Sequence, residues 1–178
     1  MSDHFEALTD KHIEFINKQK MYFVSTAGAE GRVNLSPKGL DSLRVINNKS
    51  VIWLNLTGSG NETAAHVLEN QRMTIMFCSF DKQPIILRLY GLATMIKPED
   101  DRWAEFIASF PEHLGARQIF DLKIDLVQKS CGYAVPYYDF VEERPTLHDW
   151  SNKKTNDEMK AYWSEVNALS LDGKETGS

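Results

Sequence analysis

The sequence predicts a mainly β protein, a small antiparallel barrel flanked by helices, and two observations support this. Six runs either alternate apolar with polar residues or are rich in β-branched and aromatic residues, as strands are. Hairpin turns join several of these runs, and the regular strand–helix repeat of a parallel sheet is missing. The six runs are residues 21–27, 33–39, 51–56, 72–80, 85–96 and 118–131.

The composition is typical of one domain. The chain has 178 residues, of which 42% are hydrophobic, and this is enough for one sizeable core. We therefore expect a single domain over residues 1–178. The barrel should occupy about 20–131, followed by a C-terminal loop and helices at 132–170.

A helix and a hairpin open the chain. Thr9 is a suitable N-cap for a short amphipathic helix that ends near Lys20. Residues 21–27 and 33–39 then form two strands, and the small residues Gly28–Gly31 turn the chain between them.

The return strand of this hairpin carries a polar row. Because strand side chains alternate, Asn34, Ser36 and Lys38 share one face, while the residues between them take the other. Pro37 cannot donate to a sheet ladder, so we expect this row at a sheet edge, where a ligand can reach it. An ordinary solvent-facing side of a hairpin is the alternative.

A glycine-rich loop follows the next strand. Residues 51–56 are mostly apolar on both faces, which indicates a central strand. Thr57–Thr63 then leads through small residues into a helix at 63–70, and unpaired backbone N–H groups at such a helix start attract an anion. Alternatively, Ser59 and Glu62 form a capping box and the loop is only a tight turn.

The second half of the chain supplies the remaining strands and helices. Arg88 interrupts the apolar strand at 85–96, so it should pair with a carboxylate or with a ligand anion. Later elements are a helix at 98–111, an aromatic irregular stretch at 132–145, two helix starts at Thr146 and Thr155, and a tail beyond Ser170 that should fray.

Charge and cysteine content exclude several classes of protein. The formal charge is −5 and the chain has no Lys/Arg block, so we expect neither nucleic acid nor an anionic membrane as a partner. The start of the chain does not resemble a signal peptide, and no apolar run reaches membrane-spanning length, so we expect a soluble, cytoplasmic protein. Cys78 and Cys131 are expected to be buried reduced thiols, and no metal motif is present.

Several segments together resemble the pyridoxamine 5′-phosphate oxidase-like family of FMN-binding split barrels, over about residues 10–130. These segments are Tyr22–Ala27, Asn34–Gly39, Thr57–His66, Glu69–Phe77 and Leu87–Gly91. The resemblance implies a six-stranded antiparallel Greek-key split barrel, a homodimer, and one FMN in each of two clefts between the subunits.

The resemblance also implies a set of FMN-binding residues. Lys38 matches the family lysine on the flavin phosphate, with Asn34 and Ser36 beside the ring or the ribityl chain. The residues that correspond to the segment around ribityl and phosphate are Leu54, Asn55, Ser59, Gly60 and Asn61, and Arg88 matches the arginine before the glycine of a later strand.

Two departures from the family pattern affect the expected activity. Gly60-Asn61-Glu62 stands where the oxidases carry two cations for the phosphate. Backbone N–H groups and Asn61 would have to replace those cations, with charge from Lys38 and, as a further candidate, from Arg32 or Arg117. The C-terminal Arg-x-His element that holds their substrate is also missing. We therefore expect an FMN-dependent oxidoreductase with another, unidentified small-molecule substrate, and the sequence indicates no catalytic residue.

Other functions on the same fold stay open. The protein could be a non-catalytic FMN-binding stress or redox-sensing protein, or it could use deazaflavin or haem in place of FMN. Haem is the weaker option because the five histidines are scattered without a motif.

Overall fold

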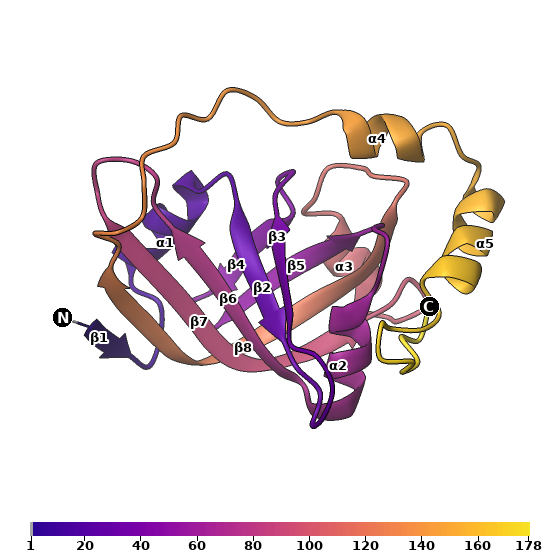
Figure 1. Ribbon diagram of the computed structural model, residues 1–178, viewed down its shortest axis with the longest axis horizontal. Coiled ribbons are helices and arrows are strands. Elements are labelled where there is room, and N and C mark those ends of the chain that lie inside the picture. Colours follow the sequence, from indigo (N-terminus) through magenta and orange to yellow (C-terminus); the bar gives the residue numbers. More distant parts are fainter. Residues whose placement is uncertain (1) are drawn as a thin grey trace.

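The computed structural model describes residues 2–178 and contains one strongly curved antiparallel sheet with helices around it (Figure 1). The strands are β1 (Ser2–Phe5), β2 (Tyr22–Thr26), β3 (Asn34–Lys38), β4 (Leu43–Asn47), β5 (Ser50–Leu56), β6 (Arg72–Cys78), β7 (Ile85–Ile96) and β8 (Ala116–Cys131). The helices are α1 (Asp10–Lys18), α2 (Glu62–Asn70), α3 (Trp103–Ile107), α4 (Thr146–Ser151) and α5 (Asn156–Val166). The strand order is β3-β2-β6-β7-β8-β5-β4, and β1 pairs with β8.

This architecture confirms the predicted class but adds two strands. The sheet has eight strands where six were expected. The additional β1 is short and largely exposed, and it lies along the end of β8. The additional β4 is interrupted by a shift in register between Val45 and Asn47. Because β1 is so short and β4 is interrupted, neither strand shows a clear alternating pattern.

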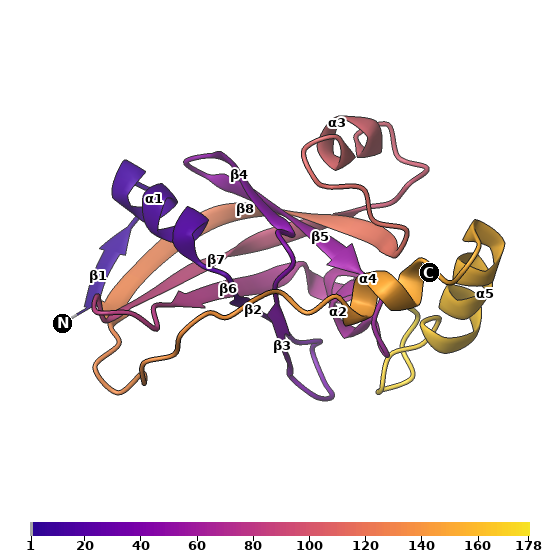
Figure 2. The same ribbon diagram turned by 90° about the horizontal axis from the view of Figure 1, so that it is seen from above.

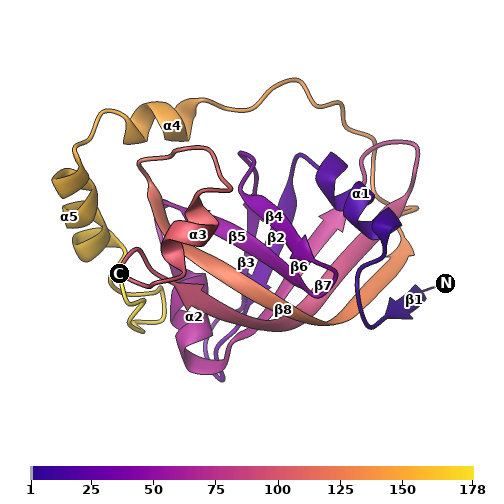
Figure 3. The ribbon, with the colours of Figure 1, turned by 180° about the vertical axis from the view of Figure 1, so that it is seen from behind.

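Strand β5 lies between two hydrophobic clusters, which confirms its expected central position. On one face, Trp53 stacks on Phe120 with ring centroids 5.0 Å apart, inside the main core. On the other face, Ile52 and Leu54 pack with α3 and the turn after it, through Phe106. Figure 3 shows α3 lying over β5 and β8 from behind. Burial on both faces makes β5 a rigid support for the residues at its end.

The helix boundaries agree only in part with the predictions. Thr9 caps α1, and Thr155 forms a capping box with Glu158 at the start of α5, both as expected. The helix predicted at 98–111 is limited to α3, because turns occupy the residues before it. Thr146 is the first residue of α4 and not its cap.

The C-terminal part crosses the molecule and returns to α2. Residues 132–145 arch over the open side of the sheet and lead into α4 and α5 (Figures 1 and 2). The arch exposes large apolar side chains, among them Tyr133 at 84% and Val141 at 87%. The predicted fraying of the tail is wrong, because Thr176 is fully buried and donates to the carbonyl of Asn167 at 2.5 Å.

The cysteines are free, and they differ in exposure. Cys78 is buried, and this burial raises the pKa of its thiol, whereas Cys131 is exposed, contrary to expectation. Cys131 is the last residue of β8, where the chain leaves the sheet. None of the helices within residues 2–178 is long and apolar enough to cross a membrane.

Candidate functional site

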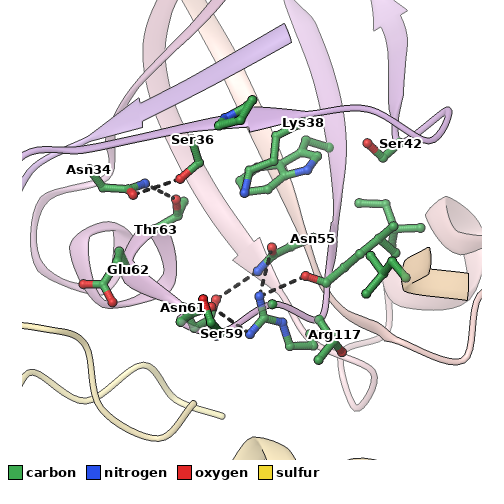
Figure 4. A pocket seen from close by; sticks show the side chains of 18 of the residues that line it. Asn34, Ser36, Lys38, Ser42, Asn55, Ser59, Asn61, Glu62, Thr63 and Arg117 are labelled. Atoms are coloured by element: carbon green, nitrogen blue, oxygen red, sulfur yellow. Dashed lines mark hydrogen bonds between the residues drawn. The ribbon is translucent and has the colours of Figure 1, made fainter. Parts of the chain in front are cut away.

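A pocket of about 630 Å³ lies where β3, the end of β5, the glycine-rich loop and the start of β8 meet (Figure 4). It brings together eight of the nine residues predicted to bind cofactor: Asn34, Ser36, Lys38, Leu54, Asn55, Ser59, Gly60 and Asn61. Arg88, the ninth, does not line this pocket, and on β7 its guanidinium donates to the hydroxyl of Ser130 at 3.2 Å.

The polar row of β3 faces this pocket. Strand β3 is an edge strand paired with β2, as Pro37 predicted. Val33, just before the strand, and Leu35 within it are 71% and 63% exposed, so they point outward. Asn34 donates to the hydroxyl of Thr63 on α2 at 3.2 Å, and this bond ties the row to the glycine loop side of the site.

Gly58 of the loop leaves space beside the backbone, whereas a Cβ atom added to Gly60 would lie 3.1 Å from Glu62 Oε1. Neither Gly58 nor Gly60 has a positive φ, so the backbone conformation itself does not require glycine. A Cβ atom added to Gly58 would meet no atom closer than the Gly60 oxygen, at 3.9 Å. The loop is therefore open at Gly58, where a ligand can approach the backbone.

The predicted capping box is wrong. Helix α2 starts at Glu62, its N-cap residue is Asn61, and no side chain caps it. The Glu62 carboxylate instead accepts the backbone N–H of Leu171, with both oxygens at 3.0 Å. Leu171, which binds Glu62 in place of the predicted Ser59, lies more than a hundred residues further along the chain.

Arg117, at the start of β8, is the buried cation of the pocket. It is only 5% exposed. Its guanidinium donates to Asn167 Oδ1 at 2.7 Å, to the Leu56 carbonyl at 3.0 Å and to the Gly60 carbonyl at 3.1 Å. All these acceptors are uncharged, and its Nε has no hydrogen-bond partner among residues 2–178. Arg32, the alternative named above, is exposed and pairs with Asp172.

Lys38 is the second cation, on the opposite side of the pocket in Figure 4. Its Nζ lies 4.9 Å from the ring centroid of Trp53. Burial, together with the charge of Arg117, lowers the pKa of Lys38 to about 8, and burial lowers the pKa of Arg117 to about 10. No salt bridge within the described residues involves either cation.

Buried amide side chains form a hydrogen-bonded network in and beside the pocket, in which Asn55 and Asn61 belong to the pocket lining. The Asn55 amide donates to Asn61 Oδ1 and to Gln118 Oε1, at 2.9 Å each. Gln118 and Asn167, both buried, were not recognised from the sequence, because an isolated amide residue has no local signature. The pocket thus combines several neutral donors with two cations that have no carboxylate partner among residues 2–178, which is the chemistry of an anion site. Its lining also contains one acidic residue, Glu62.

A second cavity of about 980 Å³ adjoins the first. The two share Pro37, Lys38, Gly39, Leu40 and Leu147 in their linings. The second cavity lies beneath the C-terminal arch, and its lining includes Tyr138, Phe140 and Trp150. A polar, cationic cavity therefore opens next to an aromatic one.

Metal and haem ligands are scarce in this part of the molecule. None of the residues that line the first pocket is His, Cys, Met or Tyr. Within residues 2–178 no group of three or more His, Cys, Asp and Glu side chains is arranged to hold a metal ion. His66 is buried and hydrogen-bonds the Thr26 hydroxyl at 3.0 Å.

Comparisons with known proteins agree with the fold. The family model described as pyridoxamine 5′-phosphate oxidase matches residues 8–131. The pyridoxamine 5′-phosphate oxidase family protein ustO of Aspergillus flavus is 36% identical over 187 residues, covering 95% of this chain and 75% of ustO.

Two solved structures share the fold at lower identity. A Lactobacillus delbrueckii protein named for pyridoxamine 5′-phosphate oxidase has a TM-score of 0.57 and 18% identity, covering 69% of this chain and 94% of that one. HupZ from Group A Streptococcus has a TM-score of 0.54 and 19% identity, covering 67% of this chain and 91% of that one. On the match of the family model and the identity with ustO, this chain belongs to the pyridoxamine 5′-phosphate oxidase family.

Proposed function

We propose that this protein binds FMN and is a flavin-dependent oxidoreductase that acts on a small organic molecule as a homodimer. One observation carries the proposal: Lys38 and Arg117 line one pocket, both lose much of their hydration, and neither has a carboxylate partner in the described part of the chain. Buried cations are normally paired, so an anion is the missing partner. Family membership makes a flavin phosphate the natural candidate.

The residues present fit such a ligand. The unsatisfied Nε of Arg117, the Lys38 ammonium and the open glycine loop would hold the phosphate. Asn34 and Ser36 on β3 would hydrogen-bond the rest of the cofactor. The pocket lining contains no haem axial ligand, and this favours flavin over haem.

The two adjoining cavities suggest separate positions for the cofactor and the substrate. A bound flavin accepts or donates a hydride, and the protein supplies position and electrostatics. Lys38 lies in the lining of both cavities, so its positive charge acts on whatever occupies either one. The aromatic arch would exclude water from the second cavity and pack against an apolar substrate there.

The first experiment is to record the absorbance spectrum of the purified protein and to titrate it with FMN. We expect saturable quenching of flavin fluorescence, with a weaker affinity in Lys38→Met and Arg117→Met and an unchanged affinity in the control Arg88→Met. If the wild-type protein neither carries nor binds FMN, the proposal is wrong. Stopped-flow mixing with NADH or NADPH then separates an oxidoreductase from a non-catalytic flavin-binding protein, because only the former is reduced.

A further inference from the structure

We propose that the C-terminal segment Ser170–Ser178 is a clasp that holds the Glu62 carboxylate away from the anion in the pocket. This inference rests on the proposed function and deepens it. It makes the clasp a positioning element for cofactor affinity, although none of its polar side chains lines the pocket.

Glu62 is the one acidic residue among those that line the pocket proposed to hold the phosphate. It lines the pocket, and its carboxylate has no salt-bridge partner among residues 2–178. Its oxygens accept the N–H of Leu171, and Figure 4 shows the side chain turned away from Lys38 and Arg117. A freely rotating carboxylate at this position would repel a phosphate, because like charges a few ångströms apart disfavour each other in a partly buried site.

The clasp is attached to the rest of the molecule at several points. Its chain reverses in a small hairpin in which Leu169 and Glu175 form a β-bridge. Two ion pairs anchor it to separate parts of the molecule: Asp172 pairs with Arg32 beyond β2, and Lys174 pairs with Glu69 on α2. Leu171 lies next to the first anchor, so its N–H is held where Glu62 can reach it.

The end of the clasp and the nearby Asn167 also contact the anion site. The Ser178 hydroxyl accepts the Asn61 amide at 2.8 Å. Asn167, fully buried, accepts Arg117 at 2.7 Å and donates to the Gly58 carbonyl at 3.1 Å. The segment thus fixes both the loop and the carboxylate beside it.

Asp172→Ala provides a sharp test, because the clasp and simple charge counting predict opposite results. Removing one negative charge should strengthen anion binding if only net charge matters. If the clasp positions Glu62, losing the Arg32 anchor should weaken FMN binding about 3- to 10-fold. Affinity for riboflavin, which has no phosphate, should change less than twofold. Asp157→Ala, an exposed acidic residue on α5, is the matched control.

A double-mutant cycle tests whether the clasp affects FMN binding through Glu62. Deletion of residues 171–178 should weaken FMN binding at least tenfold in the wild-type background and less than threefold in Glu62→Gln. Circular dichroism and thermal melting show whether each variant is folded. If the deletion variant does not fold, Asp172→Ala replaces it in the cycle. Equal losses for FMN and riboflavin, tighter FMN binding in Asp172→Ala, or no rescue by Glu62→Gln would overturn the clasp. A wild-type protein that binds neither flavin would overturn the proposed function and the clasp with it.

Discussion

At the scale of single residues, Lys38 carries the clearest prediction. Its pKa is lowered to about 8, so Lys38 is protonated at pH 7 and loses its charge as the pH rises through this pKa. FMN affinity should therefore be constant near pH 7 and fall as pH increases through 8 and 9. Isothermal titration calorimetry at a series of pH values measures this.

Two substitutions separate the charge of Lys38 from its shape. Lys38→Arg stays charged over the whole range, so its affinity should not change between pH 7 and pH 9. Lys38→Met should bind FMN about 10- to 100-fold more weakly at pH 7, since a charged hydrogen bond contributes about 1.5–3 kcal/mol. A Lys38→Met variant with wild-type affinity would contradict the assignment of Lys38.

Substitution of Gly58 should lower FMN affinity without destabilising the fold. A Cβ atom there meets no strained backbone and no close neighbour, so Gly58→Ala should leave the free energy of unfolding unchanged or raise it by about 0.4–1 kcal/mol. If the loop cradles a phosphate, the same methyl group occupies ligand space, and FMN affinity should drop at least tenfold. Urea denaturation and flavin fluorescence measure the two effects, and unchanged affinity would show that no ligand approaches the loop at this position.

At the scale of elements, Asp121 joins β8 to β5 and α3. Its side chain is almost fully buried, accepts the Ser50 hydroxyl at 2.8 Å and pairs with Arg102 at 2.5 Å and Lys123 at 3.1 Å. Burial alone would raise the pKa of Asp121, but the bonds from Arg102, Ser50 and Lys123 outweigh it and lower the pKa. The charged form is therefore preferred in the folded protein.

Asp121→Asn should destabilise the protein by about 1–3 kcal/mol at pH 7, because it removes a charge that three donors bind. The contribution is fully present above the ordinary Asp pKa of about 3.9 and is lost as pH falls through the lower folded-state value. The difference between wild type and variant in urea denaturation should thus shrink in strong acid. Asp125→Asn, exposed on the same strand, is the control and should have no effect.

At the scale of the whole molecule, the exposed apolar residues favour self-association. Leu35 on edge strand β3 and Val33 just before it project outward, on the side opposite the polar row of the pocket. The C-terminal arch adds further exposed aromatic side chains. Exposed apolar patches of this kind mark interaction surfaces. A homodimer that covers β3 would place the partner beside the cofactor site.

We therefore expect a dimer in light scattering and a shift to monomer in the double variant Val33→Asp/Leu35→Asp. FMN affinity should fall in the same variant, because the site would lose the partner's surface. Leu68→Asp, on α2 and 56% exposed, is the matched control and should stay dimeric. A wild-type monomer that binds FMN would contradict the dimer while leaving the cofactor proposal intact.

Local sequence patterns were sufficient to predict one half of the site. Strand periodicity places Asn34, Ser36 and Lys38 on one face, and Pro37 marks β3 as an edge strand. The apolar character of residues 51–56 likewise predicts the buried strand that leads into the glycine loop. These features depend on neighbouring residues only, and such patterns can be interpreted without knowing the fold.

The other half of the pocket consists of distant residues that only the folded chain brings together. Arg117 becomes its buried cation because β8 pairs with β5, and Arg88 is excluded because β7 carries it elsewhere. Glu62 binds Leu171 and not Ser59, because a backbone N–H from the C-terminal clasp reaches it in the folded chain. The physical reason is that ion pairs and buried hydrogen bonds between segments a hundred residues apart leave no periodic trace in the sequence, and they form only when the sheet has brought those segments together.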